Sequence, residues 1–291
     1  MKRNFDKLFD LIALTARTAL NIDQRLRIGS STIFLPPDHL LSRHQKVYRQ
    51  YDRFLPHLAK HLDKGSVVID VGANVGDTVA AMVAANDALH YVCVEADDGF
   101  FDYLLRNTAI LRQDNDQVSI DCHKCLIGLS VTGVTLQGVG GTKHAERSEG
   151  ADALDSKSLD ALVREIDCAP LGLIKSDVDG FDYDVIDSAQ KSISENNCLL
   201  FFECQYDTES QFEGYRNCLN RIEALGYDQY AILDNFGGLV TAAAEKSVVF
   251  ELMEYVRRQN NGDSSRTINY FDVLAYTAKH ESLVSSVISN Y

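Results

Sequence analysis

A short apolar run that leads into two spaced glycines is the strongest candidate for a ligand-binding turn. Residues 67–78 read VVIDVGANVGDT, so Gly72 and Gly76 lie between a predicted strand and a predicted helix. Glycine lets the backbone turn tightly and approach a ligand closely, and the start of the helix offers unpaired N–H groups. Asp70 stands at the end of the strand, where a cationic or amino-bearing ligand would be stabilised.

A second predicted strand ends in Glu95, twenty-five residues after Asp70. A carboxylate at that place in a βαβ unit can accept hydrogen bonds from both hydroxyls of a ribose. The glycine turn and this acid together indicate an adenosyl ligand without a phosphate. A dinucleotide fingerprint would need glycine in place of Asn74, which disfavours a nicotinamide-dependent oxidoreductase, and a phosphate-binding loop would need a lysine that is absent.

The elements that must position these residues alternate between strands and helices. Helical apolar spacing covers Thr78–Asn86, Phe100–Leu111 and Val185–Ile193. Short runs without alternation suit strands that are buried on both faces, so the pattern predicts an α/β sheet with right-handed crossovers. Seven runs are predicted as strands: Val67–Val71, Tyr91–Glu95, Val118–Cys122, Leu173–Asp177, Leu199–Cys204, Gln229–Leu233 and Phe271–Tyr276.

The chain is predicted to form one domain over residues 63–291, preceded by a helical N-terminal extension or cap over residues 1–62. That extension contains a short extended piece at Thr32–Leu35. A hairpin is expected within residues 126–150, followed by a polar, mobile loop at Gly140–Gly150. No low-complexity linker divides the chain.

Composition restricts the class of protein and its partners. The chain has 291 residues, 45% of them hydrophobic, and a formal net charge of -14, which is typical of an acidic globular protein. This charge repels nucleic acids and anionic lipid on average, and no run approaches the ~18 apolar residues of a membrane span. Seven scattered cysteines indicate a reduced, cytoplasmic protein. Cys122 and Cys125 form a Cys-x-x-Cys pattern, but no second pair of Cys or His residues accompanies it. This disfavours a zinc or redox site.

The sequence resembles the FkbM family of S-adenosylmethionine-dependent methyltransferases over about residues 66–204, with a weaker likeness at Leu35–His39. The glycine block is common to methyltransferases in general, whereas SLD followed by KxDVDG is more particular to this family. Six blocks carry the resemblance, in the family's order: VIDVGANVGDT at 68–78, CVEA at 93–96, Asn107, SLDAL at 158–162, IKSDVDGFD at 174–182 and FFEC at 201–204.

The resemblance implies a Rossmann-like class I methyltransferase fold, with a seven-stranded, mostly parallel sheet and helices on both faces. It also implies S-adenosylmethionine as the cofactor, with Glu95 on the ribose and Ala96, Cys125 and Leu126 near the adenine. The amino acid part of the cofactor would be surrounded by the turn, which comprises Asp70, Gly72, Ala73, Asn74, Gly76, Asp77 and Thr78. Three residues depart from the family's usual pattern: Cys125, Ser176 and Asp179.

Methyl transfer to oxygen requires a group that orients the acceptor hydroxyl and removes its proton. Asp177, Asp179 and Glu203 stand at predicted strand ends and are the catalytic candidates. His39 and His44 are alternative bases if the extension folds over the cleft, although packing or solvent exposure is the favoured interpretation of both. Asp177 and Asp179 could hold Mg²⁺, but this interpretation is not favoured. The spacing of residues after Asp177 does not fit a calcium-binding loop.

The sequence therefore predicts an O-methyltransferase that acts on a hydroxyl group. The resemblance favours a sugar in a glycan or polysaccharide, or a natural product, as the acceptor. The alternative is a nucleoside-binding module that keeps the fold without transfer activity. No nucleic-acid partner is expected.

Overall fold

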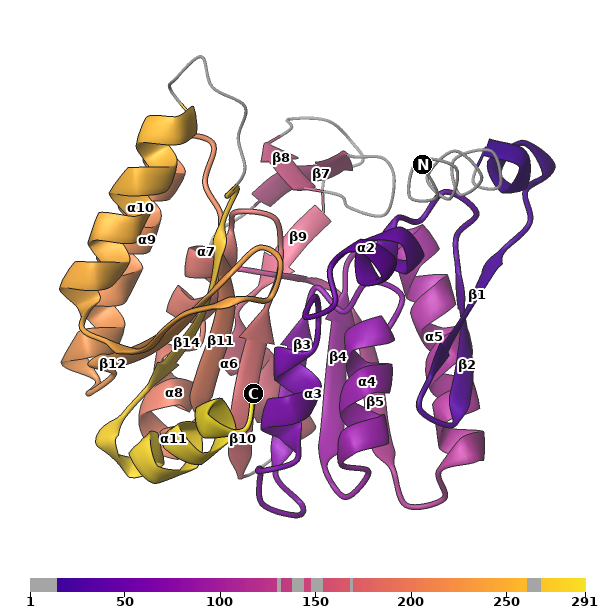
Figure 1. Cartoon of the computed structure of the whole chain (residues 1–291), viewed down its shortest axis with the longest axis horizontal. Coiled ribbons are helices and arrows are strands. Elements are labelled where there is room, and N and C mark those ends of the chain that lie inside the picture. Colours follow the sequence, from indigo (N-terminus) through magenta and orange to yellow (C-terminus); the bar gives the residue numbers. More distant parts are fainter. Residues whose placement is uncertain (1–14, 130–131, 138–143, 148–153, 168–169, 261–267) are drawn as a thin grey trace, which may run out of the picture.

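The computed structural model describes residues 15–129, 132–137, 144–147, 154–167, 170–260 and 268–291. A central sheet dominates the fold, and its strands β11, β10, β3, β4 and β5 are parallel, whereas β14 runs antiparallel to both its neighbours (Figure 1). In spatial order the eight strands are β13 (Leu239–Ala244), β12 (Gln229–Asp234), β14 (Phe271–Tyr276), β11 (Leu199–Cys204), β10 (Leu171–Ser176), β3 (Val67–Val71), β4 (His90–Glu95) and β5 (Ser119–Lys124).

The predicted fold class is confirmed, with a mostly parallel sheet between two helical layers. Each of the seven predicted strands is present, and the strands at Val67–Val71, Leu199–Cys204 and Phe271–Tyr276 have the predicted bounds. The eighth strand, β13, was not predicted because it is an exposed edge strand that ends in three alanines, a residue of low strand propensity.

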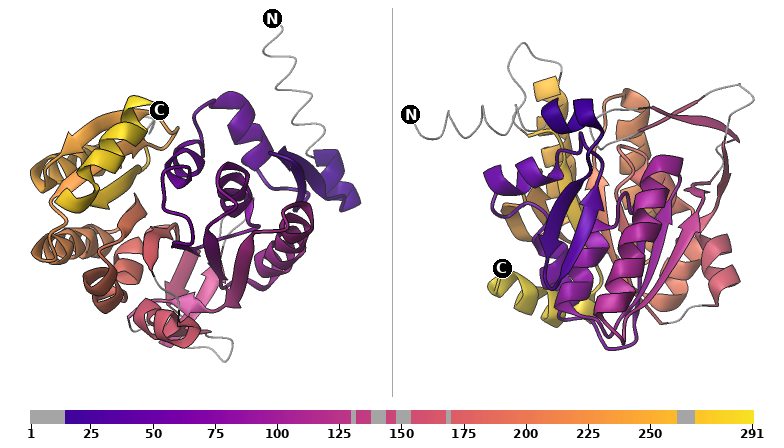
Figure 2. Two further views of the ribbon diagram at one scale, coloured as in Figure 1. Left: turned by 90° about the horizontal axis from the view of Figure 1, so that it is seen from below. Right: turned by 90° about the vertical axis from the view of Figure 1, so that its right-hand side faces the viewer.

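Helices cover both faces of the sheet (Figure 2). One layer is formed by α3 (Phe54–Ala59), α4 (Asp77–Ala85), α5 (Asp98–Asp114) and α11 (Glu281–Ser289), which follows the short 3-10 helix η1 (Ala278–His280). The other layer is formed by α6 (Leu159–Ile166), α7 (Asp182–Asp187), α8 (Gln190–Asn196), α9 (Glu209–Ala224) and α10 (Lys246–Asn260).

Two of the three predicted helices are confirmed as α4 and α5, whereas the predicted helix at Val185–Ile193 is divided into α7 and α8. The break lies at Ser188, whose hydroxyl donates to the Val185 carbonyl and accepts a hydrogen bond from the Leu159 backbone N–H. A serine hydroxyl that binds backbone groups competes with continued helix, which explains why one predicted helix became two.

The N-terminal segment packs against α4 and α5, and residues 39–41 and 44 reach the cavity at the carboxyl ends of β10 and β11. It contains the hairpin of β1 (Gln24–Ile28) and β2 (Ser31–Leu35), in which the predicted extended piece is β2, followed by α2 (Leu41–Val47). The buried Asn107 side chain holds this hairpin, because it accepts from the Phe34 N–H and donates to the carbonyls of Phe34 and Val75. The glycine turn and the hairpin are thereby fixed to α5.

A second, four-stranded sheet lies above the central one in Figure 1. Its strands β7 (Thr132–Gln137) and β8 (His144–Arg147) pair antiparallel, which confirms the predicted hairpin, and β9 (Leu154–Lys157) and β6 (Leu126–Ile127) complete it. The prediction of a loop over residues 140–150 is wrong for residues 144–147, because these form β8. Its remaining residues lie outside the described part of the chain.

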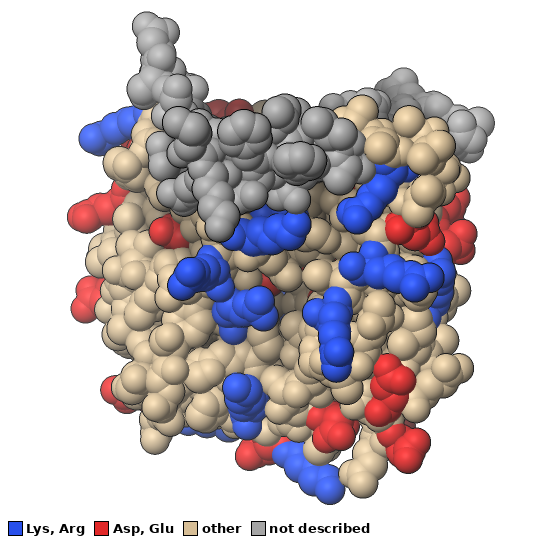
Figure 3. Space-filling model, turned by 45° about the vertical axis from the view of Figure 1, so that its right-hand side comes forward, with Lys and Arg blue, Asp and Glu red and all other residues tan. Residues whose placement is uncertain are grey.

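Charge is distributed unevenly despite the acidic total. Residues 15–64 contain nine Lys and Arg against four Asp and no Glu, and Figure 3 shows basic side chains gathered on the face where this segment packs. The acidic excess therefore belongs to the rest of the chain.

Within the described ranges, no helix has the length and hydropathy that a bilayer span requires.

Candidate functional site

The glycine turn passes unusually close to the end of a neighbouring strand. Gly72 has φ +74° and Gly76, which caps α4, has φ +82°, so both occupy the left-handed region. A Cβ atom on Gly72 would lie 2.0 Å from the backbone oxygen of Asp177. Only glycine allows this approach of β3 to the segment after β10, which explains the residue type at this position.

Glu95 anchors the turn from the neighbouring strand. Its Oε2 accepts a hydrogen bond from the Asn74 backbone N–H and its Oε1 accepts one from the Asp97 N–H, each at 2.8 Å. Burial raises the pKa of Glu95, and these two N–H donors oppose the rise. Each carboxylate oxygen retains a second lone pair, so the side chain can still accept ligand hydroxyls.

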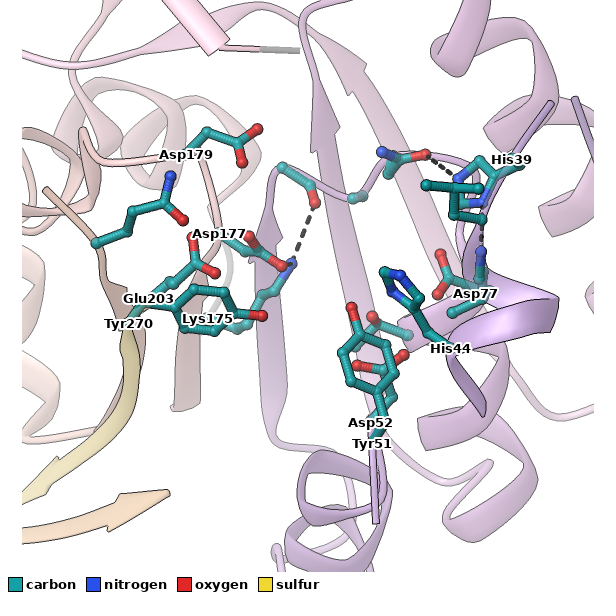
Figure 4. A pocket seen from close by; sticks show the side chains of 17 residues that line it. His39, His44, Tyr51, Asp52, Asp77, Lys175, Asp177, Asp179, Glu203 and Tyr270 are labelled. Atoms are coloured by element: carbon teal, nitrogen blue, oxygen red, sulfur yellow. Dashed lines mark hydrogen bonds and ion pairs between the residues drawn. The ribbon is translucent and has the colours of Figure 1, made fainter. Parts of the chain in front are cut away.

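A cavity of about 400 Å³ opens between the glycine turn and the ends of β10 and β11 (Figure 4). Its size lies within the usual range for small-molecule sites. The cavity brings all three catalytic candidates together with part of the predicted cofactor set. The predicted site residues that line it are Gly72, Ala73, Asn74, Asp77, Thr78, Asp177, Asp179 and Glu203.

The remaining predicted cofactor residues are not among the residues that line this cavity. Gly76 caps α4, whereas Glu95 is the last residue of β4 and Ala96 follows it. Cys125 and Leu126 are half-buried where β5 leads into β6, and Cys125 packs against the apolar core. Asp70 is the last of these six residues. It lies beneath the cavity floor, where it forms an ion pair with a lysine.

That lysine, Lys175 on β10, organises the floor of the site. Its Nζ lies 2.7 Å from Asp70 Oδ1 and 3.6 Å from Asp177 Oδ2, and it donates to the Gly72 carbonyl at 3.1 Å. Burial alone would lower the pKa of Lys175, but the charges of Asp70 and Asp177 raise it above its ordinary value. Burial raises the pKa of Asp70 to about 6, against the opposing effect of Lys175. One charged lysine therefore ties β3, the glycine turn and the β10 end together.

Glu203 and Asp177 occupy different environments although both face the cavity. Asp177 has a half-exposed side chain, whereas Glu203 is buried and its Oε2 has no hydrogen-bond partner. Burial, followed by the charge of Asp177, raises the pKa of Glu203 well above its ordinary value. Glu203 therefore keeps its proton to a higher pH than an exposed glutamate would, whereas Asp177 lies beside the Lys175 ammonium.

The N-terminal segment contributes two histidine side chains to the cavity, although the sequence favoured packing or solvent exposure for both. His39 and His44 both line the cavity. The Nδ1 of His39 accepts from the Leu41 N–H at 3.3 Å, so its Nε2 carries the proton and donates to Asn74 Oδ1 at 3.3 Å. The weak likeness at Leu35–His39 was the signal that pointed to this segment.

Further cavity residues carried no motif at all. Tyr51 and Asp52 come from the connection between α2 and α3, Gln205 follows β11, and Tyr270 precedes β14. Among the described residues, no group of three His, Cys, Asp or Glu side chains is arranged to hold a metal ion.

Ser176, one of the departures from the family pattern, has a structural partner. Its hydroxyl donates to Asp182 Oδ1 at 2.6 Å, and the Tyr215 hydroxyl lies 3.2 Å from Asp182 Oδ2. Asp182 is completely buried, and burial followed by the charge of Asp177 raises its pKa to about 7. This carboxyl group is therefore more than the helix-start residue that its position at α7 suggested.

Asp182 is expected to make stability depend on pH. Its pKa is about 7 in the folded chain and about 4 when unfolded, so the folded state holds the extra proton between these values. This group's contribution to the free energy of unfolding therefore falls as pH rises from about 4 to 7. Asp182→Asn has no carboxyl group to titrate here. Its free energy of unfolding, measured in urea, should therefore rise relative to that of the parent as pH increases from 5 to 8. The exposed Asp228→Asn should follow the parent, and parallel curves for Asp182→Asn would contradict the assignment.

Comparison with known proteins identifies a family. The model of the methyltransferase FkbM domain matches residues 70–228. A solved FkbM methyltransferase from Methylobacillus flagellatus KT is 18% identical with a TM-score of 0.43, covering 58% of this chain and 40% of that one. An O-methyltransferase from Bacillus cereus, solved with SAH, is 11% identical with a TM-score of 0.44, covering 82% of this chain and 89% of that one.

No curated protein matches the chain. The chain spans 40% of the length of the solved FkbM protein. The family match begins at Asp70 within β3 and continues past the three catalytic candidates, over more than half of the chain. The protein therefore belongs to the FkbM methyltransferase family.

Proposed function

We propose that the protein transfers a methyl group from S-adenosylmethionine to a hydroxyl of an acceptor, which is a sugar in a glycan or a natural product. The observation that carries this proposal is the shared cavity, in which the glycine turn faces Asp177, Asp179 and Glu203. A nucleoside-binding turn and proton-accepting groups thus meet in one space of about 400 Å³. The glycan acceptor rests on the family resemblance.

The described residues fit an adenosyl cofactor. Gly72 lets the turn lie against the segment after β10, and the start of α4 at Asp77 offers the N–H groups of a helix start beside the turn. Glu95 is held by two backbone contacts in a position to accept the ribose hydroxyls. When bound, S-adenosylmethionine supplies an electrophilic methyl group on a sulfonium. These residues would fix its orientation, a contribution that can reach ~7–11 kcal/mol in well-aligned reactions.

Asp177 is the best-placed group for removing the acceptor proton. Its carboxylate is stabilised by Lys175 at 3.6 Å and is half exposed to the cavity. The raised pKa of Glu203 favours its protonated form, which can instead donate a hydrogen bond to an acceptor oxygen. Asp179, with φ +50° in the tight turn after β10, would bind a further acceptor hydroxyl.

Residues 1–62 are proposed to act as a cap on a methyltransferase domain formed by residues 63–291. Support comes from α2 and the preceding loop, because His39 and His44 line the cavity together with residues of the sheet. The six cysteines in the described ranges are free thiols, which agrees with the proposed cytoplasmic location.

Two measurements test the proposal directly. Calorimetry should detect binding of S-adenosylhomocysteine, and a screen of glycans and small alcohols should find uptake of a labelled methyl group, with EDTA testing for a metal. Absence of both heat and a thermal shift at saturating protein concentration would remove the cofactor assignment.

Glu95→Ala should weaken the binding of S-adenosylhomocysteine by about ten- to a hundredfold. Hydrogen bonds to a charged group contribute ~1.5–3 kcal/mol, and the variant loses those to the ribose and the anchor of Asn74. Glu95→Gln keeps oxygen and nitrogen atoms at this place and should be affected less. Unchanged affinity of Glu95→Ala in calorimetry would refute the ribose assignment.

A further inference from the structure

A small side chamber of about 60 Å³ adjoins the main cavity. The two spaces share the following lining residues: Tyr51, Asp52, Thr78, Lys175, Asp177, Glu203 and Tyr270. Asp272, near the start of β14, lines only the chamber. A group that entered it would remain close to Asp177.

The chamber contains an excess of carboxylates that the fold itself does not need. Glu203 on β11 is the direct cross-strand partner of Asp272 on β14, and like charges opposite one another destabilise an antiparallel pair. Asp52 and Asp177 add two more. Among the described lining residues, Lys175 is the one Lys or Arg, and its closest carboxylate is Asp70 outside the chamber.

Glu203 gives an independent sign of a missing partner. The residue is 6% exposed, and its Oε2 is buried with no hydrogen-bond partner. Figure 4 shows the side chain directed toward the space between Asp177 and Tyr270. A buried polar oxygen without a partner is unfavourable, so a hydrogen-bond donor on a ligand at this point would remove that penalty.

The walls of the chamber favour an ammonium group over a metal ion. Tyr51 and Tyr270 present aromatic rings beside the carboxylates, and aromatic rings with carboxylates bind organic cations well. The described carboxylates do not converge as a metal-ligand group. A volume of about 60 Å³ accommodates an ammonium with the adjoining carbon, and little more.

We propose that the side chamber binds a protonated amino group of the acceptor, between Glu203 and Asp272. This inference rests on the proposed function and narrows its substrate class to amino sugars and other amino alcohols. The amine would fix the acceptor so that a nearby hydroxyl faces Asp177. Burial, followed by the charge of Asp177, raises the pKa values of both Glu203 and Asp272, and a cation bound between them would oppose this rise.

The test compares two probes of similar size that differ in charge. Calorimetry with protein saturated with S-adenosylhomocysteine should show ethanolamine, which is protonated at pH 7.5, binding at least about tenfold more tightly than ethylene glycol. Glu203→Gln and Asp272→Asn should each abolish most of this preference. Glu213→Gln removes one charge from an exposed position on α9 and should retain it.

The outcomes separate this inference from the proposed function. If S-adenosylhomocysteine binds but ethanolamine binds no better than ethylene glycol, the ammonium site is refuted and the methyltransferase proposal stands. Failure of S-adenosylhomocysteine to bind refutes the cofactor assignment, and the same probe comparison on the free protein then decides the chamber alone. Thermal unfolding identifies a variant that does not fold, and the other variant then decides. A preference that survives in a folded variant also refutes the site.

Discussion

Lys175→Met is expected to lower the free energy of unfolding by about 3–5 kcal/mol at pH 8, the usual effect of removing one partner of a buried ion pair. Asp70 is 1% exposed and would lose its partner at 2.7 Å. Its pKa, already raised to about 6 by burial, would rise further without the lysine. The folded variant would then bind a proton that the unfolded chain releases, so its stability should fall as pH rises from 5 to 8.

Urea unfolding of matched variants checks this expectation. Lys175→Met combined with Asp70→Asn removes both charges and should recover part of the loss. Lys191→Met changes a lysine on α8 whose side chain is 69% exposed, and it should shift stability by no more than about 0.5 kcal/mol. If Lys175→Met is as mild as Lys191→Met at pH 8, the buried pair does not hold the floor of the site.

Asp177→Asn is expected to lower kcat by at least about a hundredfold, the lower end of a general base's usual contribution. The amide has nearly the same shape but cannot accept the acceptor proton. The Asp177 carbonyl that lies against Gly72 is unchanged, so the affinity for S-adenosylhomocysteine should change by less than about threefold.

Labelled methyl transfer and calorimetry separate the two effects. Asp228→Asn changes an exposed aspartate before β12 and should keep the parent's kcat. Equal turnover of Asp177→Asn and the parent would exclude Asp177 as the base. A parallel loss of affinity and kcat would make it a binding residue instead.

The central strands were predictable because burial on both faces leaves uninterrupted apolar runs. β3 and β11 are completely buried along their length, and their bounds follow from sequence alone. β13 lies at the edge, mostly exposed, where no apolar run is required. Its pairing with β12 depends on tertiary contacts, which the local sequence does not determine.

The site was predictable to the extent that it follows strand ends. Gly72, Asp177 and Glu203 come directly after or at the ends of parallel strands, and such ends meet at one edge of a sheet. Tyr51 and Asp272 come from segments without a motif. Their place in the site depends on how the N-terminal segment and β14 fold back onto that edge.

The reversed direction of β14 brings residues from outside the family match into the site. Because β14 is antiparallel to β11, its first residues reach the edge where the parallel strands end, and Asp272 meets Glu203 there. The family match ends at residue 228, so Tyr270 and Asp272 lie beyond it, as Tyr51 and Asp52 lie before it. Acceptor preference could therefore diversify between relatives by exchange of these flanking segments alone. A chimaera that retains residues 70–228 should keep its cofactor while acquiring the acceptor range of the donor of its flanks.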